Sequence, residues 1–269
     1  MGCTFSSSRR RSRLGPYPSS EPPPSYSASG PRPPRYSHFP PTARRVSRRN
    51  SLRPSDSLAA SGIRDQLCVS KEMLLYSLRI VGEYLYQQGV NIIIVASADV
   101  VDMVHLDILP SSDNIAFFNY RLTGEQTNVL SDAVDEAILR QGLCDSNFLS
   151  DSQFPQRLGE RLTEDSILQS HIIYHRGGLT VLAPPWNYLF CYQVYFLDTR
   201  HGIYETDDLD DAVDYLKEYL ARDCIHTVPY SDIRRWAVQF CLHLPRRILA
   251  EVNDHYYVRF SRSPIDFST

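Results

Sequence analysis

The first 64 residues carry too few large apolar side chains to build a hydrophobic core. They hold 11 of the 18 prolines of the chain and a dense run of serines. They also contain 12 arginines and no lysine, against two acidic residues. Because so little apolar surface cannot offset the entropy lost on ordering the backbone, the sequence predicts a disordered basic tail over residues 1–64. Any folded domain must lie in the rest of the chain.

From about residue 68 the composition is typical of a globular domain. This body of the chain is acidic, because the residues beyond the tail carry 16 basic and 29 acidic side chains. No apolar run approaches the roughly 18 residues that a membrane span requires, and no signal peptide is recognisable. The six cysteines are scattered without a CxxC pair. We therefore expect reduced thiols in a cytosolic setting.

Two Cys-x-His pairs raise the question of zinc. Cys224 precedes His226 by two residues, and Cys241 precedes His243 in the same way. Residues two apart on a helix point in diverging directions, so neither pair is arranged to share one ion. We therefore expect no metal and no other cofactor.

The first six residues match the pattern M-G-x-x-x-[ST], which predicts myristoylation of Gly2. One myristoyl chain binds a membrane only marginally, so a second signal is needed. Palmitoylation of Cys3 and the arginines within residues 9–13 are adjacent candidates, and each arginine near an anionic membrane contributes about 1 kcal/mol. We expect peripheral attachment to the cytoplasmic face of a membrane through this lipid anchor and these arginines.

The tail also repeats a proline-tyrosine pattern, in Pro23-Pro24-Ser25-Tyr26 and in Pro33-Pro34-Arg35-Tyr36. Paired prolines favour a polyproline II ribbon, and the tyrosine two places on can fill an aromatic-lined groove. Both segments resemble the PPxY ligand of WW domains. Two copies ten residues apart permit bivalent binding, so a WW-domain protein is a candidate partner.

Arginines precede three serines, Ser12, Ser47 and Ser51, in the manner of basophilic kinase sites. Phosphate on Ser12 would add up to about two negative charges beside the membrane-binding arginines and weaken the attachment. A plain solvated linker is the alternative. Nucleic-acid binding is not expected, because interleaved aromatic residues are few and the body is acidic. The sequence does not indicate an oligomeric state.

The body reads as a helix, two strands, a second helix, a hairpin and then further helices. Ser70 can cap a helix that ends at Gly89, and the apolar run of residues 91–97 follows as a strand. A helical turn through Val104 comes next, and residues 110–119 predict the second strand. Residues 123–142 predict a helix, and a hairpin turns at Arg176-Gly177-Gly178. Helices are expected over 186–198, 207–222, 229–242 and 246–256.

This order implies an α/β (α+β) fold, with a small mixed sheet and a helical C-terminal half. The acids at positions 207, 208, 210 and 211 lie in the first turn of a helix, where carboxylates suit the dipole, so we interpret them as structural. His171 and His175, four apart on the expected strand, share a face and are interpreted as packing residues. Trp186, Tyr188 and Phe190 are expected to pack the helical half onto the sheet.

Four segments together resemble a fungal family of unassigned function with a nucleotidyltransferase-like domain. They are LCVSKEMLLYSLRIVGEYLYQQGVNIIIVAS, SSDNIAFFN, GGLTVLAPPWNYLFCYQVYFLD and DLDDAVDYL. The resemblance covers about residues 66–260, and its most specific part is the order of GGL, APPWNY and DLDDAV. It implies that a Gly-Gly turn follows the first strand and that a D-x-D pair on the next strand holds divalent metal against nucleotide phosphates.

The chain departs from that pattern at both places. The glycine pair falls within residues 96–99, which contain no glycine, and a side chain there obstructs the approach of a phosphate. The D-x-D pair falls on Asn114 and Ala116, where a neutral amide and a methyl group cannot hold two magnesium ions. Asp113 would share the face of Ile115 on a strand, so it is a poor replacement.

The sequence also lacks a G-x-S-x-G elbow, a P-loop, a G-x-G-x-x-G turn and an H-E-x-x-H motif. It therefore predicts a lipid-anchored, catalytically inactive interaction module. Two alternatives remain open. One is an active transferase that uses unconventional acids, Asp99, Asp102 or Asp113, and the other is a nucleotide-sensing pseudoenzyme.

Overall fold

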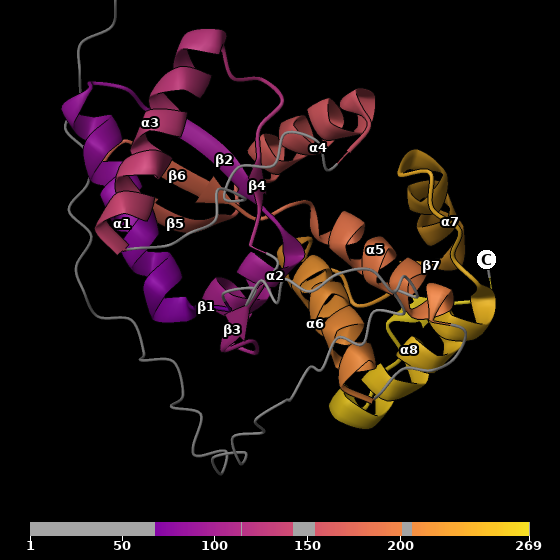
Figure 1. The fold of residues 1–269 in the computed structure, drawn as a ribbon. Coiled ribbons are helices and arrows are strands. Elements are labelled where there is room, and N and C mark those ends of the chain that lie inside the picture. Colours follow the sequence, from indigo (N-terminus) through magenta and orange to yellow (C-terminus); the bar gives the residue numbers. More distant parts are fainter. Residues whose placement is uncertain (1–67, 114, 142–153, 201–205, 269) are drawn as a thin grey trace, which may run out of the picture. The chain divides into compact units, whose positions relative to one another are not determined.

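The computed structural model describes residues 68–268, except for residue 114 and segments 142–153 and 201–205 (Figure 1). Several predicted sites lie outside these residues, namely lipidation at Gly2 and Cys3, docking at Pro23, Pro24, Tyr26, Pro33, Pro34 and Tyr36, phosphorylation at Ser12, Ser47 and Ser51, and the lost metal position Asn114.

Helix α1 (Lys71–Gln87) begins where the sequence predicts it. The hydroxyl of Ser70 accepts a hydrogen bond from the Met73 amide at 3.3 Å, which satisfies one free donor of the first turn. Gly89 follows the helix with φ +69°, a left-handed conformation that ends helices. The predicted apolar stripe is fully buried, at Leu74, Leu78, Val81 and Leu85.

A four-stranded mixed sheet forms the centre of the first half, in the order β4-β2-β6-β5. Its strands are β2 (Ile92–Ala96), β4 (Phe117–Phe118), β5 (Ile172–Arg176) and β6 (Leu179–Leu182). β2 runs parallel to β6 and antiparallel to β4, and β5 and β6 form the predicted antiparallel hairpin. The fold is therefore mixed α/β with small mixed sheets and a helical C-terminal half, as the sequence predicts.

The turn of the β5–β6 hairpin lies directly against α1. Gly177 takes φ +58°, and the amide of Gly178 donates a 2.9 Å hydrogen bond to the carbonyl oxygen of Gly82 on the helix. A Cβ atom placed on Gly82 would lie 2.3 Å from the carbonyl oxygen of Arg176. The glycines thus permit backbone-to-backbone packing of the hairpin on α1.

The single strand predicted over residues 110–119 is wrong. β3 (Ser111–Ser112) pairs with β1 (Val69–Ser70) in a separate two-stranded sheet, and only β4 joins the central sheet. The chain moves from one sheet to the other between these strands, so a continuous strand cannot form. Residues 115–118 are all buried rather than alternately exposed, because both faces of this segment are covered.

Three helical segments connect the strands. α2 (Ala98–Val101) continues into the short π-helix η1 (Asp102–Leu106), which confirms the helical turn predicted through Val104. α3 (Gly124–Gln141) matches the predicted helix, and it packs against α1 on one side of the sheet (Figure 1). α4 (Gln156–Gln169) was not expected from the sequence.

The C-terminal half is helical, and its elements match the prediction within a few residues. It comprises α5 (Trp186–Thr199), α6 (Thr206–Arg222), α7 (Tyr230–Gln239), α8 (Arg246–Phe260) and a small parallel pair of β7 (Val228–Pro229) with β8 (Ile265–Asp266). A proline precedes α5, α7 and α8, where its missing N–H and fixed φ suit the start of a helix. In the part of the chain that the structure describes, no helix combines the length and apolarity needed to cross a bilayer.

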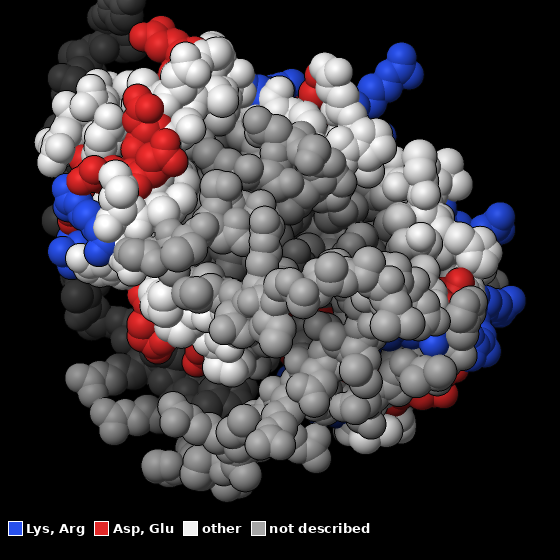
Figure 2. Space-filling view, in the orientation of Figure 1, with Lys and Arg blue, Asp and Glu red and all other residues white. Residues whose placement is uncertain are grey.

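Acidic side chains gather over α3 in Figure 2. Glu125, Asp132 and Asp135 are exposed on this helix, and Arg140 near its end pairs with Glu136. The opposite face of α3 buries Leu130, Ala133 and Val134. The helix is therefore amphipathic, and its outer face carries part of the negative charge that the composition places in the body.

Candidate functional site

Ser97, within the segment that the resemblance assigns to a glycine turn, lies beside Ala116, which the resemblance assigns to a metal ligand. Ser97 is the residue between β2 and α2, and its amide donates a 2.8 Å hydrogen bond to the carbonyl oxygen of Ala116. In return, the Ala116 amide donates to the Ser97 hydroxyl at 3.3 Å. The structure thus brings the predicted turn and the predicted metal position together, with a buried methyl group at Ala116.

Three acids near this point are the unconventional ligands that the sequence left open for an active transferase. Asp99 is partly exposed, and its Oδ2 accepts a 2.5 Å hydrogen bond from the Ser112 hydroxyl. Asp102 is only 3% exposed, and its Oδ1 accepts a 2.7 Å hydrogen bond from the Tyr215 hydroxyl. Asp113 is exposed to solvent. Two of the three acids therefore serve as acceptors for side chains of β3 and α6.

Two tyrosines of the helical half extend this acidic region. Burial, and then the charges of Asp102 and Asp211, raise the pKa of Tyr215 well above its ordinary value. Burial also raises the pKa of Tyr192, with a smaller contribution from Asp99. Both hydroxyls thus stay protonated at neutral pH, and Tyr215 remains a donor to Asp102.

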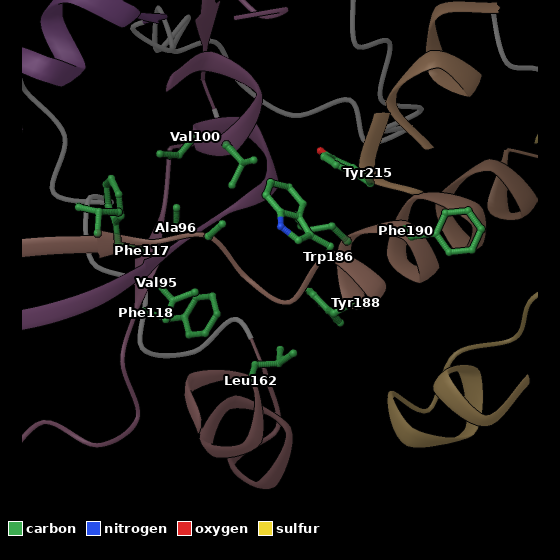
Figure 3. Close-up of a cluster of buried hydrophobic side chains, with 14 of the residues drawn as sticks. Val95, Ala96, Val100, Phe117, Phe118, Leu162, Trp186, Tyr188, Phe190 and Tyr215 are labelled. Carbon is green, nitrogen blue, oxygen red and sulfur yellow. The ribbon is translucent and has the colours of Figure 1, made fainter. Parts of the chain in front are cut away.

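An aromatic cluster joins the end of the sheet to the helical half (Figure 3). Trp186 lies between the end of β2 and Tyr215, with ring centroids of Trp186 and Tyr215 6.4 Å apart. Tyr188 packs edge-on against Phe240 at 5.2 Å. Trp186, Tyr188 and Phe190 are all buried, which confirms the packing role predicted for them.

The prediction that His171 and His175 share a strand face is wrong. His175 contacts the Thr180 hydroxyl across the hairpin at 2.9 Å. His171 precedes β5 and instead lies against His105 and Trp186. A bulge between Ile172 and Tyr174 shifts the register of β5, so the simple alternation of side chains does not extend to His171.

The acid run at the start of α6 holds helices together. Asp208 pairs with Arg200 at 2.9 Å, and the side chain of Gln193 on α5 donates to its carbonyl oxygen. Asp210 pairs with His255 of α8 at 2.9 Å. These contacts, and the start of the helix at Thr206, agree with the structural role predicted for these acids.

The Cys-x-His pairs lie at the ends of helices. Cys224 and Cys241 both follow helix termini with left-handed φ, and both are exposed. His226 contacts Arg262, and His243 lies 3.7 Å from Asp198. Among the described side chains, no group of three or more His, Cys, Asp or Glu residues has the arrangement of a metal site.

A polar groove of about 620 Å³ lies elsewhere, against α4 and the segment before α3. It is lined by Tyr120, Arg121, Arg157, Glu160, Arg161, Glu164 and Asp165. Arg121 pairs with Glu164, and Arg161 pairs with Asp165. Most of the charge in this groove is thus already paired.

Sequence reasoning missed the partners that hold the acids of the candidate site. Ser112 is 13 residues from Asp99, and Tyr215 is 113 residues from Asp102. Such pairs follow from the tertiary fold alone.

No family model, no curated protein and no solved structure matches the chain.

Proposed function

We propose that the body, residues 66–260, is a catalytically inactive, nucleotidyltransferase-like interaction module. Lipids on Gly2 and Cys3 would hold it at the cytoplasmic face of a membrane. The PPxY segments of the tail would dock a WW-domain protein. The membrane and that protein are thus the proposed partners.

The observation that carries the absence of catalysis is the environment of Ala116. Two-metal phosphoryl transfer needs carboxylates that hold divalent ions against phosphates. Ala116 offers a buried methyl group there, and its backbone is paired with Ser97 on both sides. A methyl group supplies no oxygen ligand, and magnesium demands oxygen ligands in near-ideal octahedral geometry.

The rival is a metal-dependent transferase built on Asp99, Asp102 and Asp113. The hydrogen bonds of Asp99 and Asp102 weigh against it, because a metal would have to compete with Ser112 and with buried Tyr215. Incubating the full-length protein with labelled nucleoside triphosphates and manganese tests this directly. The proposal expects no nucleotidyl transfer to the protein or to generic acceptors, and transfer lost in Asp102→Asn would favour the rival.

A second candidate, a nucleotide sensor, is favoured by one observation. The ring of Tyr192 is 41% exposed and stacks on Tyr188 at 5.9 Å, next to Asp99. An exposed aromatic ring can stack on a base without metal chemistry. Fluorescence anisotropy with a labelled nucleotide in EDTA separates the two candidates. Binding that Tyr192→Ala abolishes would support the sensor, and no binding would leave the interaction module.

The anchor is tested by fractionation of cells that express the full-length protein. The wild type is expected with membranes, and Gly2→Ala is expected in the soluble fraction. Cys3→Ser should weaken retention, because one acyl chain alone binds marginally. Unchanged membrane association of Gly2→Ala would contradict the anchor.

A further inference from the structure

Two histidines meet where η1, β5, α5 and α6 come together. Nδ1 of His105 lies 3.5 Å from Nε2 of His171, and the rings are edge-on with centroids 4.5 Å apart. Trp186 covers both, with its centroid 5.5 Å from His105 and 5.1 Å from His171. The pair joins η1 to the segment that enters β5, although the two residues are 66 positions apart.

The charged groups around this pair come chiefly from α6. Nε2 of His105 lies 3.7 Å from a carboxylate oxygen of Glu218. On the same helix, the positive charge of Arg222 acts on His171, and that of Lys217 acts on Glu218. On η1 itself, the carboxylate of Asp102 binds the Tyr215 hydroxyl.

The elements on the other sides contribute uncharged groups. Trp186 of α5 places its ring against both imidazoles. Its amide donates to Gln169 of α4 at 3.1 Å, and the same Gln169 oxygen accepts from Arg222 at 3.2 Å. Arg222 is therefore held beside the pair, where it opposes a second positive charge.

The contact between the two ring nitrogens allows one proton between them but not two. With one proton in the contact, the protonated ring nitrogen donates a hydrogen bond to the unprotonated nitrogen of the other ring. With both rings charged, two N–H groups point at each other and two positive charges lie close together in a half-buried place. Burial, and then the charge of His105, already lower the pKa of His171 below its ordinary value.

We propose that His105 and His171 form an acid-sensitive latch, which is closed while the pair holds at most one proton and releases η1 from the segment that enters β5 when both rings are protonated. The latch goes beyond the proposed function and does not depend on it. η1 directly follows α2, so its release would loosen the segment that carries Asp99 and Asp102. Acidification would thus act on the candidate site through the backbone of η1.

The sign of the stability change follows from the lowered pKa of His171. A base whose pKa is lower in the folded state than in the unfolded state makes its full contribution to stability when the pH is above its unfolded pKa, which is 6.5 for His171. That stability is lost as the pH falls from 6.5 through the folded value. The contact with His105 lowers the pKa of Glu218, whose contribution is lost only below its ordinary value of 4.5. Between these limits, His171 loses its contribution to stability while Glu218 keeps its own.

The experiment uses the full-length protein with Trp236→Phe, which leaves Trp186 as the only tryptophan, since the chain has two. A charged imidazole quenches a neighbouring indole, so Trp186 fluorescence reports protonation of the pair. NMR of the imidazole protons between pH 8 and pH 5 assigns each step. We expect two separate steps for the coupled pair, with quenching that deepens at the lower one.

Two variants with opposite expected effects on the pKa of His171 keep the test decisive even if one of them folds poorly. His105→Gln should leave one step and raise the pKa of His171, and Glu218→Gln should lower the pKa of His171 further, because a favourable negative charge is lost. His243→Gln is the matched control, since His243 pairs with Asp198 elsewhere, and should change neither step. Circular dichroism checks folding. A single step for His171 at pH 6.5 in the parent protein, or one that neither variant moves, would overturn the latch.

Discussion

The hydroxyl of Tyr215 donates a 2.7 Å hydrogen bond to Oδ1 of Asp102 and so joins α6 to η1. Both side chains are almost fully buried, at 1% and 3% exposure. A carboxylate that could serve as an unconventional metal ligand is therefore a structural acceptor between the two halves of the body. Burial makes this bond costly to break, because each polar group would lose its partner without gaining water.

Tyr215→Phe removes the donor and keeps the ring. We expect the free energy of unfolding to fall by about 1–3 kcal/mol, the cost of losing a buried hydrogen-bond partner. Chemical denaturation at pH 7 measures it. Tyr257→Phe is the control, because Tyr257 is 56% exposed, and should stay within about 0.5 kcal/mol of the wild type. Equal stability of the two variants would contradict a structural role for the bond.

Gly82→Ala tests the close packing of the hairpin on α1. Helix propensity alone predicts that alanine stabilises a helix by up to about 1 kcal/mol. The new Cβ would instead lie 2.3 Å from the Arg176 carbonyl oxygen, so we expect destabilisation of about 1–3 kcal/mol. Gly124→Ala, at the start of α3 with open space around it, is the matched control and should be neutral or slightly stabilising. A stabilised Gly82→Ala protein would show that α1 and the hairpin do not pack this closely.

The parts of the fold that the sequence predicts are those with a strong local signal. Ser70 and Gly89 mark the ends of α1, and Gly177 marks the hairpin turn, because each residue has a distinct backbone preference. α4 is preceded by Pro155, but its own residues carry no such signal. Its buried face consists of Gly159, Leu162, Thr163 and Ser166, so three of four core positions are small or polar and show no apolar periodicity.

The candidate site could be predicted only in part. The absence of carboxylate at Ala116 and of glycine in residues 96–99 is visible in the sequence, and the structure places these segments together. The partners of Asp99 and Asp102 are not visible, because Ser112 and Tyr215 reach them only through the tertiary fold. The placement of β3 and β4 in two different sheets likewise depends on long-range strand pairing, which no local pattern encodes.

A peptide covering residues 20–38 tests the docking segments without the folded body. We expect a WW domain to bind it, and we expect Tyr26→Ala with Tyr36→Ala to abolish binding, because each tyrosine fills the groove that its prolines address. With a protein that carries two linked WW domains, each single variant should bind more weakly than the parent, since the bivalent advantage is lost. Isothermal titration gives the affinities. Equal affinity of the doubly substituted peptide would show that the prolines and tyrosines reflect composition alone.

Asn114→Asp with Ala116→Asp restores two carboxylates to the positions that the resemblance assigns to metal. We expect measurable divalent-ion binding, at the cost of lower stability in metal-free buffer, because Ala116 is only 4% exposed and a charge is introduced there. Thermal unfolding with and without manganese measures both effects. Nucleotidyl transfer need not return, since the turn after β2 still lacks glycine. A variant as stable as the wild type that gains no stability from manganese would contradict the assignment of these positions.

Calorimetric titration of manganese into the unaltered full-length protein tests the central claim, that the site does not hold catalytic metal. The account predicts no saturable heat of binding for the wild type, and a saturable signal for the protein with both restored aspartates. Asp99→Asn and Asp102→Asn should leave the wild-type result unchanged. Tight binding of manganese by the unaltered protein, lost in Asp99→Asn or Asp102→Asn, would contradict the account and establish these acids as ligands of a working site.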